Sequence, residues 1–326
     1  MSIPTEKTNY VFGPVPSRRL GHSLGVDLVP FKTCSYDCVY CQLGRTTCKT
    51  VEQKDFVPVK NVLKEIKNKV ATPPLPDYIT LSGSGEPTLY SEIYQLIREI
   101  KNITDIPVAV LTNGSLLWNE DVQRSVGKAD LVIPSLDAGN EIEFQCVNRP
   151  HPDISFEKMI QGLTAFRRIY TGQLWLEVFL LNGVTANDES VQRIAEFTAD
   201  IAPEKIQLNT VVRPPAEDFA FAVPEKQMHR FAALLGDKAE VIAEYRAVHD
   251  EKGFSVTRDA VYELLKRRPC SLEDIASGLS IHRNEAIKHV QELLTENKIK
   301  IDTGKKKRFF KILSSGRNND NHIETQ

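Results

Sequence analysis

The sequence lacks any long apolar run. No stretch reaches the roughly 20 consecutive apolar residues that a membrane-spanning helix needs, and the opening residues, MSIPTEKTNY, show no basic segment followed by an apolar core. We therefore expect a cytoplasmic protein with no membrane partner. Net charge is also small, at −2 over 326 residues, so composition by itself predicts no general affinity for nucleic acid.

Cysteine is scarce as well, with six residues in the chain. Three of them, Cys34, Cys38 and Cys41, are crowded together, which is unlike the disulfide framework of a small secreted domain. This crowding predicts a set of metal ligands in a reducing compartment. We expect the isolated Cys146 and Cys270 to be small buried residues.

Short apolar, β-branched runs alternate with amphipathic stretches of helical period from about residue 24 to 245. Such alternation predicts βα units around a parallel sheet, and hence the α/β class, as an open barrel or a doubly wound sheet. We expect strands at 23–30, 77–83, 108–114, 130–136, 174–181 and 205–212, and helices at 59–69, 91–102, 156–170, 189–201 and 226–236. In either architecture, ligands bind at the carboxyl ends of the strands.

Residues 256–313 have a different character. A helical pattern at 258–268 ends at Pro269, and Ser271 with Asp274 forms a capping box that predicts a short helix. A helix at 282–297 and a hairpin at 298–312 follow, an order that resembles a winged helix. We therefore expect three parts: an α/β domain over 1–250, a winged-helix-like domain over 256–313 and a disordered tail over 314–326.

The string CSYDCVYC directly follows the first expected strand. Thiolates at this spacing lie on one loop and can converge on one soft metal centre. Ordinary iron–sulfur sites use four cysteines, so a cluster held by three would keep one iron without a protein ligand. The alternatives are a zinc site completed by His22 or Cys48, and buried cysteines with no ligand.

CxxxCxxC with an aromatic residue, Tyr40, before its last cysteine resembles the motif of radical S-adenosylmethionine (SAM) enzymes. The resemblance implies a partial (β/α)6 barrel and a [4Fe-4S] cluster held by Cys34, Cys38 and Cys41. It also implies that SAM chelates the remaining iron and is cleaved by one electron to a 5'-deoxyadenosyl radical. An electron donor such as flavodoxin or ferredoxin is implied in the same way.

Further segments resemble the places where this family contacts SAM. LSGSGEPTL resembles the GGEP segment, with Ser84 at its first glycine and Gly85 and Glu86 after it. Asn113 in LTNG, and Ser135 with Asp137 in PSLD, resemble positions that touch the cofactor. By this resemblance Tyr40, Ser84, Gly85, Glu86, Asn113 and Ser135 are the predicted cofactor-binding residues, although turn and cap chemistry is the alternative for each loop.

The stretch VFGPVPSRRLGHSLGVD, with PFKTCSYDCVYCQLGRT, resembles an uncharacterised radical SAM oxidoreductase subgroup distantly similar to wyosine-type tRNA modification enzymes. Arg18, Arg19 and Arg45 flank the cysteine loop. They either neutralise the cluster, meet a phosphate-bearing substrate or are merely solvated or paired. Arg213 either binds an anionic substrate or forms a surface salt bridge.

Positive charge gathers in residues 256–313, which hold 13 Lys and Arg against 8 Asp and Glu. Lys305, Lys306, Lys307 and Arg308 occupy the expected hairpin tip, and Arg283 and Lys288 the preceding helix. This pattern predicts contact with nucleic acid, such as tRNA, or with a docked peptide. A redox-sensing winged-helix regulator is the competing hypothesis to an enzyme.

Overall fold

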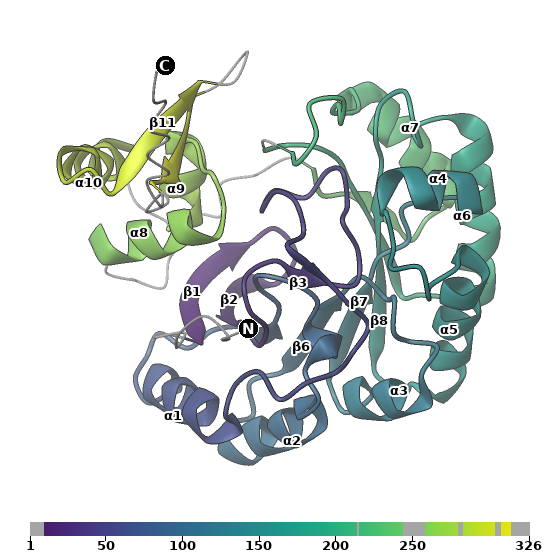
Figure 1. Cartoon of the computed structure of the whole chain (residues 1–326), viewed down its shortest axis with the longest axis horizontal. Helices are drawn as coiled ribbons and strands as arrows, with labels where there is room; N and C mark the ends of the chain where they lie inside the picture. The colour runs from purple at the N-terminus through teal and green to yellow at the C-terminus, as the bar shows by residue number, and fades with distance from the viewer. Residues whose placement is uncertain (1–9, 214, 244–257, 280–282, 304–307, 314–326) are drawn as a thin grey trace, which may run out of the picture.

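The computed structural model describes residues 10–213, 215–243, 258–279, 283–303 and 308–313. Eight strands form one curved sheet in the order β1-β2-β5-β6-β7-β8-β9-β10 (Figure 1). Their bounds are β1 Val11–Ser17, β2 Gly21–Val26, β5 Tyr78–Leu81, β6 Val108–Thr112, β7 Leu131–Pro134, β8 Gln173–Phe179, β9 Lys205–Asn209 and β10 Ala239–Val241. The strands from β2 onward are parallel, whereas β1 is antiparallel to β2.

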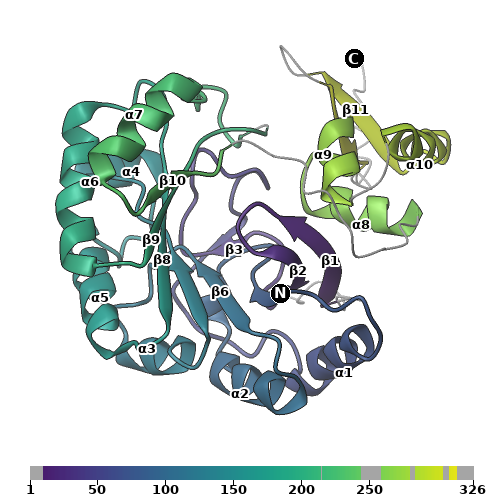
Figure 2. The same cartoon turned by 180° about the vertical axis from the view of Figure 1, so that it is seen from behind.

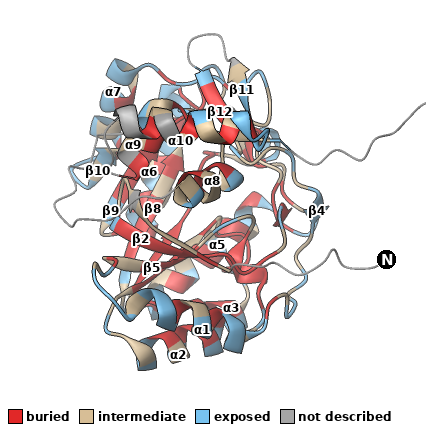
Figure 3. Ribbon diagram, turned by 90° about the vertical axis from the view of Figure 1, so that its left-hand side faces the viewer, coloured by how far each residue is buried: buried red, intermediate tan, exposed pale blue. Residues whose placement is uncertain are grey.

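The helices cover the convex face of the sheet (Figure 2). They are α1 Val59–Val70, α2 Ile93–Ile103, α3 Glu120–Val126, α4 Glu141–Val147, α5 Phe156–Ile169, α6 Asp188–Ile201 and α7 Glu225–Leu235. Leu24 and Val26 of β2 pack in the core beneath these helices, while the alternating side chains face the concave side. Figure 3 shows the result, with buried strands inside helices whose outer faces are exposed.

Apolar side chains fill the amino-terminal end of the concave face. Leu20, Ala109, Leu131, Ile133 and Trp175 form a buried cluster there, separate from the core under the helices. Polar side chains and loops are therefore left to the opposite end, where the parallel strands finish. All six expected strands are found at their predicted positions, so the α/β assignment is confirmed.

Strand β1 was not expected from the sequence. Its residues VFGPVPS contain two prolines, and the register with β2 shifts between Phe12 and Val15. Proline removes a ladder donor, so within sheets it is confined to edge strands and bulges. In the sequence these prolines argue against a strand. They are compatible with β1 because it is an edge strand of the sheet.

The C-terminal part follows the predicted order of elements. It comprises α8 Arg258–Arg267, α9 Leu272–Gly278, α10 Arg283–Thr295 and an antiparallel pair, β11 Ile299–Thr303 with β12 Arg308–Ile312. The capping box is confirmed: Ser271 N donates to Asp274 and Asp274 N donates to Ser271 Oγ, at 2.9 and 3.1 Å. The C-terminal part has its own hydrophobic core, in which Cys270 is fully buried, as predicted.

Several predicted features of this part lie outside the described residues. Lys305, Lys306 and Lys307 fall in 304–307, the tail is 314–326, and the junction near residue 250 falls in 244–257. The side chains of Arg283 and Lys288 are likewise outside the described part, whereas Arg308 is described and exposed.

The C-terminal part packs against strand β1. Val15 contacts its core, and the Arg267 guanidinium lies over the ring of Phe12. Phe12 in turn lies against Gly25 of β2, where a Cβ atom would come within 1.9 Å of the ring. Arg213, after β9, adds an ion pair to Asp274 of α9 at 3.7 Å. The edge strand is therefore covered.

Among the described residues, none of the helices is both long enough and apolar enough to cross a lipid bilayer.

Helix α5 offers a test of the packing. A Cβ atom at Gly162 would lie 2.5 Å from the backbone nitrogen of Trp118. Replacing an exposed helical glycine with alanine normally stabilises by about 1 kcal/mol. Here we expect Gly162→Ala to destabilise by about 1–3 kcal/mol, since backbone must move. Gln161→Ala, exposed on the same helix, is the control, and urea unfolding is the measurement. A more stable Gly162→Ala protein would contradict this packing.

Candidate functional site

The structure brings the three clustered cysteines to the carboxyl edge of the sheet. Cys34 ends the short strand β3 Thr33–Cys34, which pairs with β4 Cys48–Lys49, and Cys38 and Cys41 follow on the same loop. All three are partly buried. The loop is fixed to the end of α4, because Val39 N donates to the carbonyl of Val147 at 2.9 Å.

Each of the three sulfur atoms accepts a hydrogen bond from a side-chain N–H group. Asn113 Nδ2 donates to Cys34 Sγ and Asn148 Nδ2 to Cys38 Sγ, both at 3.6 Å. The Lys32 ammonium donates to Cys41 Sγ at 3.1 Å. Hydrogen bonds to sulfur ligands stabilise the thiolate form and tune the potential of an iron–sulfur centre.

Burial makes these thiolates costly without a cation. Burial raises the pKa of Cys34 to about 12, with the Glu86 carboxylate adding to the effect. Burial likewise raises the pKa of Cys38 well above its ordinary value. Since thiolates are the metal-binding form, a cationic centre would supply the missing stabilisation.

The donor set suits a cluster better than a single ion. Within the described residues, no group of three or more His, Cys, Asp or Glu side chains lies close enough to hold one metal ion. Cysteines around an iron–sulfur cluster bind different irons, so their sulfurs need not meet at one point.

Cys48 is exposed and pairs with Thr33 rather than Cys34, so it lies on the opposite face. His22 is near the amino end of β2. Neither completes a zinc site.

One cysteine prediction is wrong. Cys146 is exposed on α4, not buried. The buried positions of this helix are Phe144 and Val147, three residues apart, and their spacing leaves position 146 on the solvent side.

Glu86 joins the loops beside the cysteines. It is buried, and its carboxylate accepts from Thr88 N and Oγ1, Thr112 Oγ1 and Asn113 N, at 2.6 to 3.0 Å. Burial raises its pKa, and these hydrogen bonds oppose that shift. Next to it, a Cβ atom at Gly85 would lie 1.8 Å from the Thr33 carbonyl oxygen, so only glycine lets this loop approach β3.

Ser84, the departure from the GGEP pattern, has a partner of its own. Its hydroxyl and its backbone N–H both donate to the carboxylate of Asp27, directly after β2. Its carbonyl accepts from the N–H of Lys32 at 2.7 Å. The serine therefore connects the end of β5 to the end of β2 and to the residue that contacts Cys41.

Tyr40 is held firmly beside the cysteines. Its ring stacks on Phe179 with centroids 3.9 Å apart, and its hydroxyl donates to Asp137. Asp137 also accepts from Asn148 Nδ2 and Phe179 N, at 2.8 and 3.0 Å. Burial raises the pKa of Asp137 to about 6, and the hydrogen bonds from Tyr40 and Asn148 oppose the rise. Ser135, the other predicted residue after β7, is partly buried.

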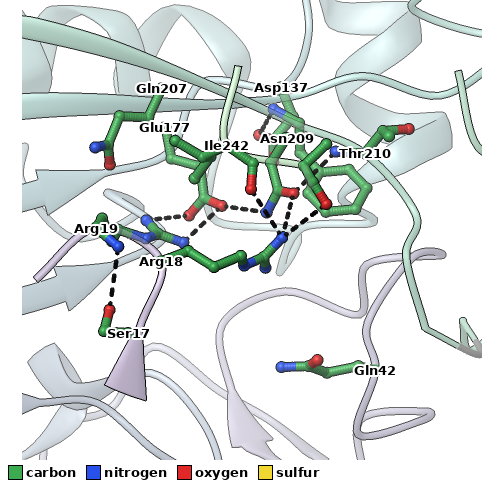
Figure 4. Close-up of polar contacts among 12 residues, drawn as sticks. Ser17, Arg18, Arg19, Gln42, Asp137, Glu177, Gln207, Asn209, Thr210 and Ile242 are labelled. Atoms are coloured by element: carbon green, nitrogen blue, oxygen red, sulfur yellow. Dashed lines mark hydrogen bonds and ion pairs between the residues drawn. The ribbon is translucent and has the colours of Figure 1, made fainter. Parts of the chain in front are cut away.

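The predicted arginines have different surroundings. Arg19 forms a two-bond ion pair with Glu177 of β8, at 2.9 and 3.0 Å (Figure 4). Burial acts to raise the pKa of Glu177, but Arg19, Asn209 and Arg18 together outweigh it and the pKa is lowered. Arg45 is exposed and pairs with Asp37 and Glu217, so the interpretation as a paired surface residue fits it.

Arg18 and Arg213 differ from these. In the part of the chain that the structure describes, Arg18 Nη1 donates to neutral oxygens alone, namely Asn209 Oδ1 and the carbonyls of Ile242 and Ala243, at 3.1 to 3.3 Å (Figure 4). Arg213 is buried, so its ion pair with Asp274 is not the expected surface salt bridge.

The sequence analysis missed several site residues. Lys32, Asn148 and Asp27 follow no recognised motif, and Lys32 acts on the loop only because of the fold. Glu177 carried a usable signal, since it is the only charged residue in the apolar run LWLEVFLL. A charge in a buried strand needs a partner, and Arg19 is that partner.

Comparison with known proteins identifies the class. Residues 28–198 match the family model described as the Radical SAM superfamily. The chain belongs to this superfamily, whose members catalyse radical reactions with a [4Fe-4S] cluster and SAM. These are therefore its cofactors, and the three-cysteine donor set fits the cluster. Enzymes of this kind need a reductant.

Particular relatives can then be named. A UPF0026 protein of Methanocaldococcus jannaschii is 36% identical over 300 residues, covering 89% of this chain and 88% of that protein. A protein of Brachyspira hyodysenteriae named GTPase Obg is 40% identical over 291 residues. That match covers 88% of this chain but only 42% of the Brachyspira protein, so the chain spans less than half of that relative.

Solved structures agree at the level of fold. A radical SAM methyltransferase from Sphaerobacter thermophilus matches with a TM-score of 0.52 at 18% identity, covering 67% of this chain and 65% of that chain. Archaeal TYW1 also matches, with a TM-score of 0.47 at 15% identity, covering 74% and 78%. The first match shows that the two chains share a fold.

Lys32 provides a test of the site. We expect Lys32→Met to lower the reduction potential of the reconstituted cluster by on the order of 100 mV, because a unit charge a few ångströms away favours the reduced form. Redox titration followed by electron paramagnetic resonance measures it. Lys49→Met is the control, since the Lys49 ammonium contacts carbonyls of Arg149 and Pro150 instead of a sulfur. Equal shifts in both variants would refute a specific role for Lys32.

Proposed function

We propose that this chain is a radical SAM enzyme that cleaves SAM reductively to a 5'-deoxyadenosyl radical. Cys34, Cys38 and Cys41 bind three irons of the cluster, and SAM occupies the fourth. The observation that carries the proposal is the set of three partly buried sulfurs, each with one N–H donor, at the edge of the sheet where the parallel strands end.

In this proposal the chain holds SAM with the loops after β2, β5, β6 and β7. Tyr40, Ser84, Gly85, Glu86, Asn113 and Ser135 form that binding region. The Glu86 carboxylate is already used by four donors, so its contribution is to position the backbone of residues 84–86 and the side chain of Asn113. Backbone groups of this loop are then available to the methionine part of SAM.

The C-terminal part is proposed to be a winged helix, which would give the enzyme a partial (β/α)6 barrel with an appended recognition domain. Three helices followed by an antiparallel pair support this assignment. Its partner remains a prediction: tRNA or another nucleic acid, or a peptide. The electron donor is proposed to be a flavodoxin or a ferredoxin.

The test is the formation of 5'-deoxyadenosine. We expect oxygen-free protein reconstituted with iron and sulfide to cleave SAM when reduced with dithionite. Changing Cys34, Cys38 or Cys41 to Ala should reduce the product to background, because each change removes one cluster ligand. Liquid chromatography of the nucleoside products measures it.

Cys48→Ala is the matched control, because Cys48 is a nearby exposed cysteine on the opposite face of β4. It should retain both the cluster absorbance and SAM cleavage. Stable zinc in place of iron after oxygen-free purification, with sequence-specific DNA binding, would instead favour the redox-sensing regulator.

A further inference from the structure

A cavity of about 920 Å³ runs along the concave face of the sheet. At one end it is lined by Gln42 and Ser84, beside the proposed cofactor loops. At the other end it is lined by Glu263, Arg267 and Arg268 of the C-terminal part. Its volume lies in the range of small-molecule sites. One ligand can therefore reach from the cofactor loops to α8.

The acidic side chains on the cavity wall already have partners. These pairs are Glu65 with the backbone N–H groups of Tyr10 and Val11, Glu263 with Lys266, and Asp259 with Arg258. Two of the basic groups are also satisfied: Arg19 pairs with Glu177, and Lys69 donates to the carbonyl of Gly13. The charges that remain on the wall are arginines.

Arg18 is the first of them. Within the described residues, its hydrogen bonds all go to neutral oxygens (Figure 4). Burial, together with the nearby Arg213, Arg19 and Arg268, lowers its pKa to about 9, while Glu177 opposes them. A partly buried guanidinium surrounded by like charges is unfavourable unless an anion joins it.

Arg267 and Arg268 line the same cavity from the C-terminal part, and Arg268 is close enough to Arg18 to lower its pKa. In both residues the Nε atom is buried and has no hydrogen-bond partner in the described part of the chain. Burial lowers the pKa of Arg267 to about 10, although Asp27 and Glu263 raise it. Buried donors of this kind are costly when they stay unpaired.

We propose that Arg18, Arg267 and Arg268 bind a phosphate group of the substrate, which extends from there toward Ser84 and Gln42. The proposal rests on the proposed function for the reacting end. Phosphate offers several charged oxygens, and the planar guanidinium fork matches them with paired hydrogen bonds. Three guanidiniums on one cavity wall carry more positive charge than a single carboxylate balances, so a phosphate dianion suits them better. The C-terminal part then supplies one wall of the substrate site.

Phosphate can come from a small phosphate ester or from the end of an RNA chain. The volume of the cavity favours the small ester, or a terminal nucleotide alone. Both sources present the same group to the three arginines, so the experiment compares them directly.

The experiment measures binding of inorganic pyrophosphate to the full chain with its reconstituted cluster, by isothermal titration calorimetry. We expect Arg268→Gln to weaken binding by at least about tenfold, because hydrogen bonds to charged groups contribute about 1.5–3 kcal/mol. Arg268→Lys keeps the charge but not the fork, so a smaller loss is expected. Arg230→Gln, at an exposed arginine of α7 outside the cavity wall, is the control and should bind like the unchanged protein.

A second arm identifies the source of the phosphate. Displacement of pyrophosphate by a short RNA with a 5'-phosphate, but not by the same RNA without it, assigns the site to an RNA end. Failure of both RNAs to displace pyrophosphate assigns it to a small ester. Equal displacement by both RNAs would overturn the proposal, because the terminal phosphate would then be irrelevant.

Two other results would also overturn it. One is no pyrophosphate binding by the unchanged protein, and the other is equal affinity in Arg268→Gln with amide exchange in α8 showing that the helix is intact. SAM cleavage is measured separately. Lost pyrophosphate binding with intact cleavage removes only this inference, whereas lost cleavage with intact binding removes only the proposed function.

Discussion

The buried carboxylate of Glu86 is the constraint on which the site depends. It ties the short helix η1 Pro87–Leu89 to the end of β6, and the neighbouring N–H of Glu86 itself donates to Thr33 of the cysteine loop at 3.1 Å. Three segments that are distant in sequence are thereby fixed around one buried charge. The same carboxylate accepts a hydrogen bond from the backbone N–H of Asn113, whose side chain donates to Cys34. Displacing Glu86 would move the donors as well as the loop.

Sequence patterns predicted the parts of the molecule that repeat or that form local motifs. The six parallel strands follow from apolar periodicity, and the capping box at Ser271 follows from two residues three positions apart. What the sequence could not supply are contacts between distant segments. Asn148 reaches Cys38 only because the cysteine loop and the end of α4 are brought together, and Lys32 reaches Cys41 only because the loop between them turns back. Strand β1 was not predicted because its prolines are acceptable only in an edge strand. Whether a strand lies at an edge is known only from the assembled sheet.

Acidic and basic side chains have different surroundings at the two ends of the concave side. Near the cysteines, the carboxylates of Glu86 and Asp137 are buried among hydrogen-bond donors, which suits a region that must hold a cationic centre beside thiolates. On the cavity wall, by contrast, four arginines lie among acidic residues that have partners of their own. The ion pair of Arg19 with Glu177 lies between these regions and separates them. Such an arrangement gives a bound molecule a defined direction, because its ends meet different potentials.

Arg18 also joins the two ends of the sheet. It follows β1, and the carbonyls that it contacts, those of Ile242 and Ala243, follow β10. Within the described residues the sheet order ends at these two strands, with no ladder between them. A molecule that draws Arg18 away therefore breaks the hydrogen bonds that link the two edges of the sheet. By thermodynamic linkage, a change that moves the two edges of the sheet apart must alter the affinity for the ligand. The bound ligand must in turn alter the equilibrium between closer and wider edges by the same free energy.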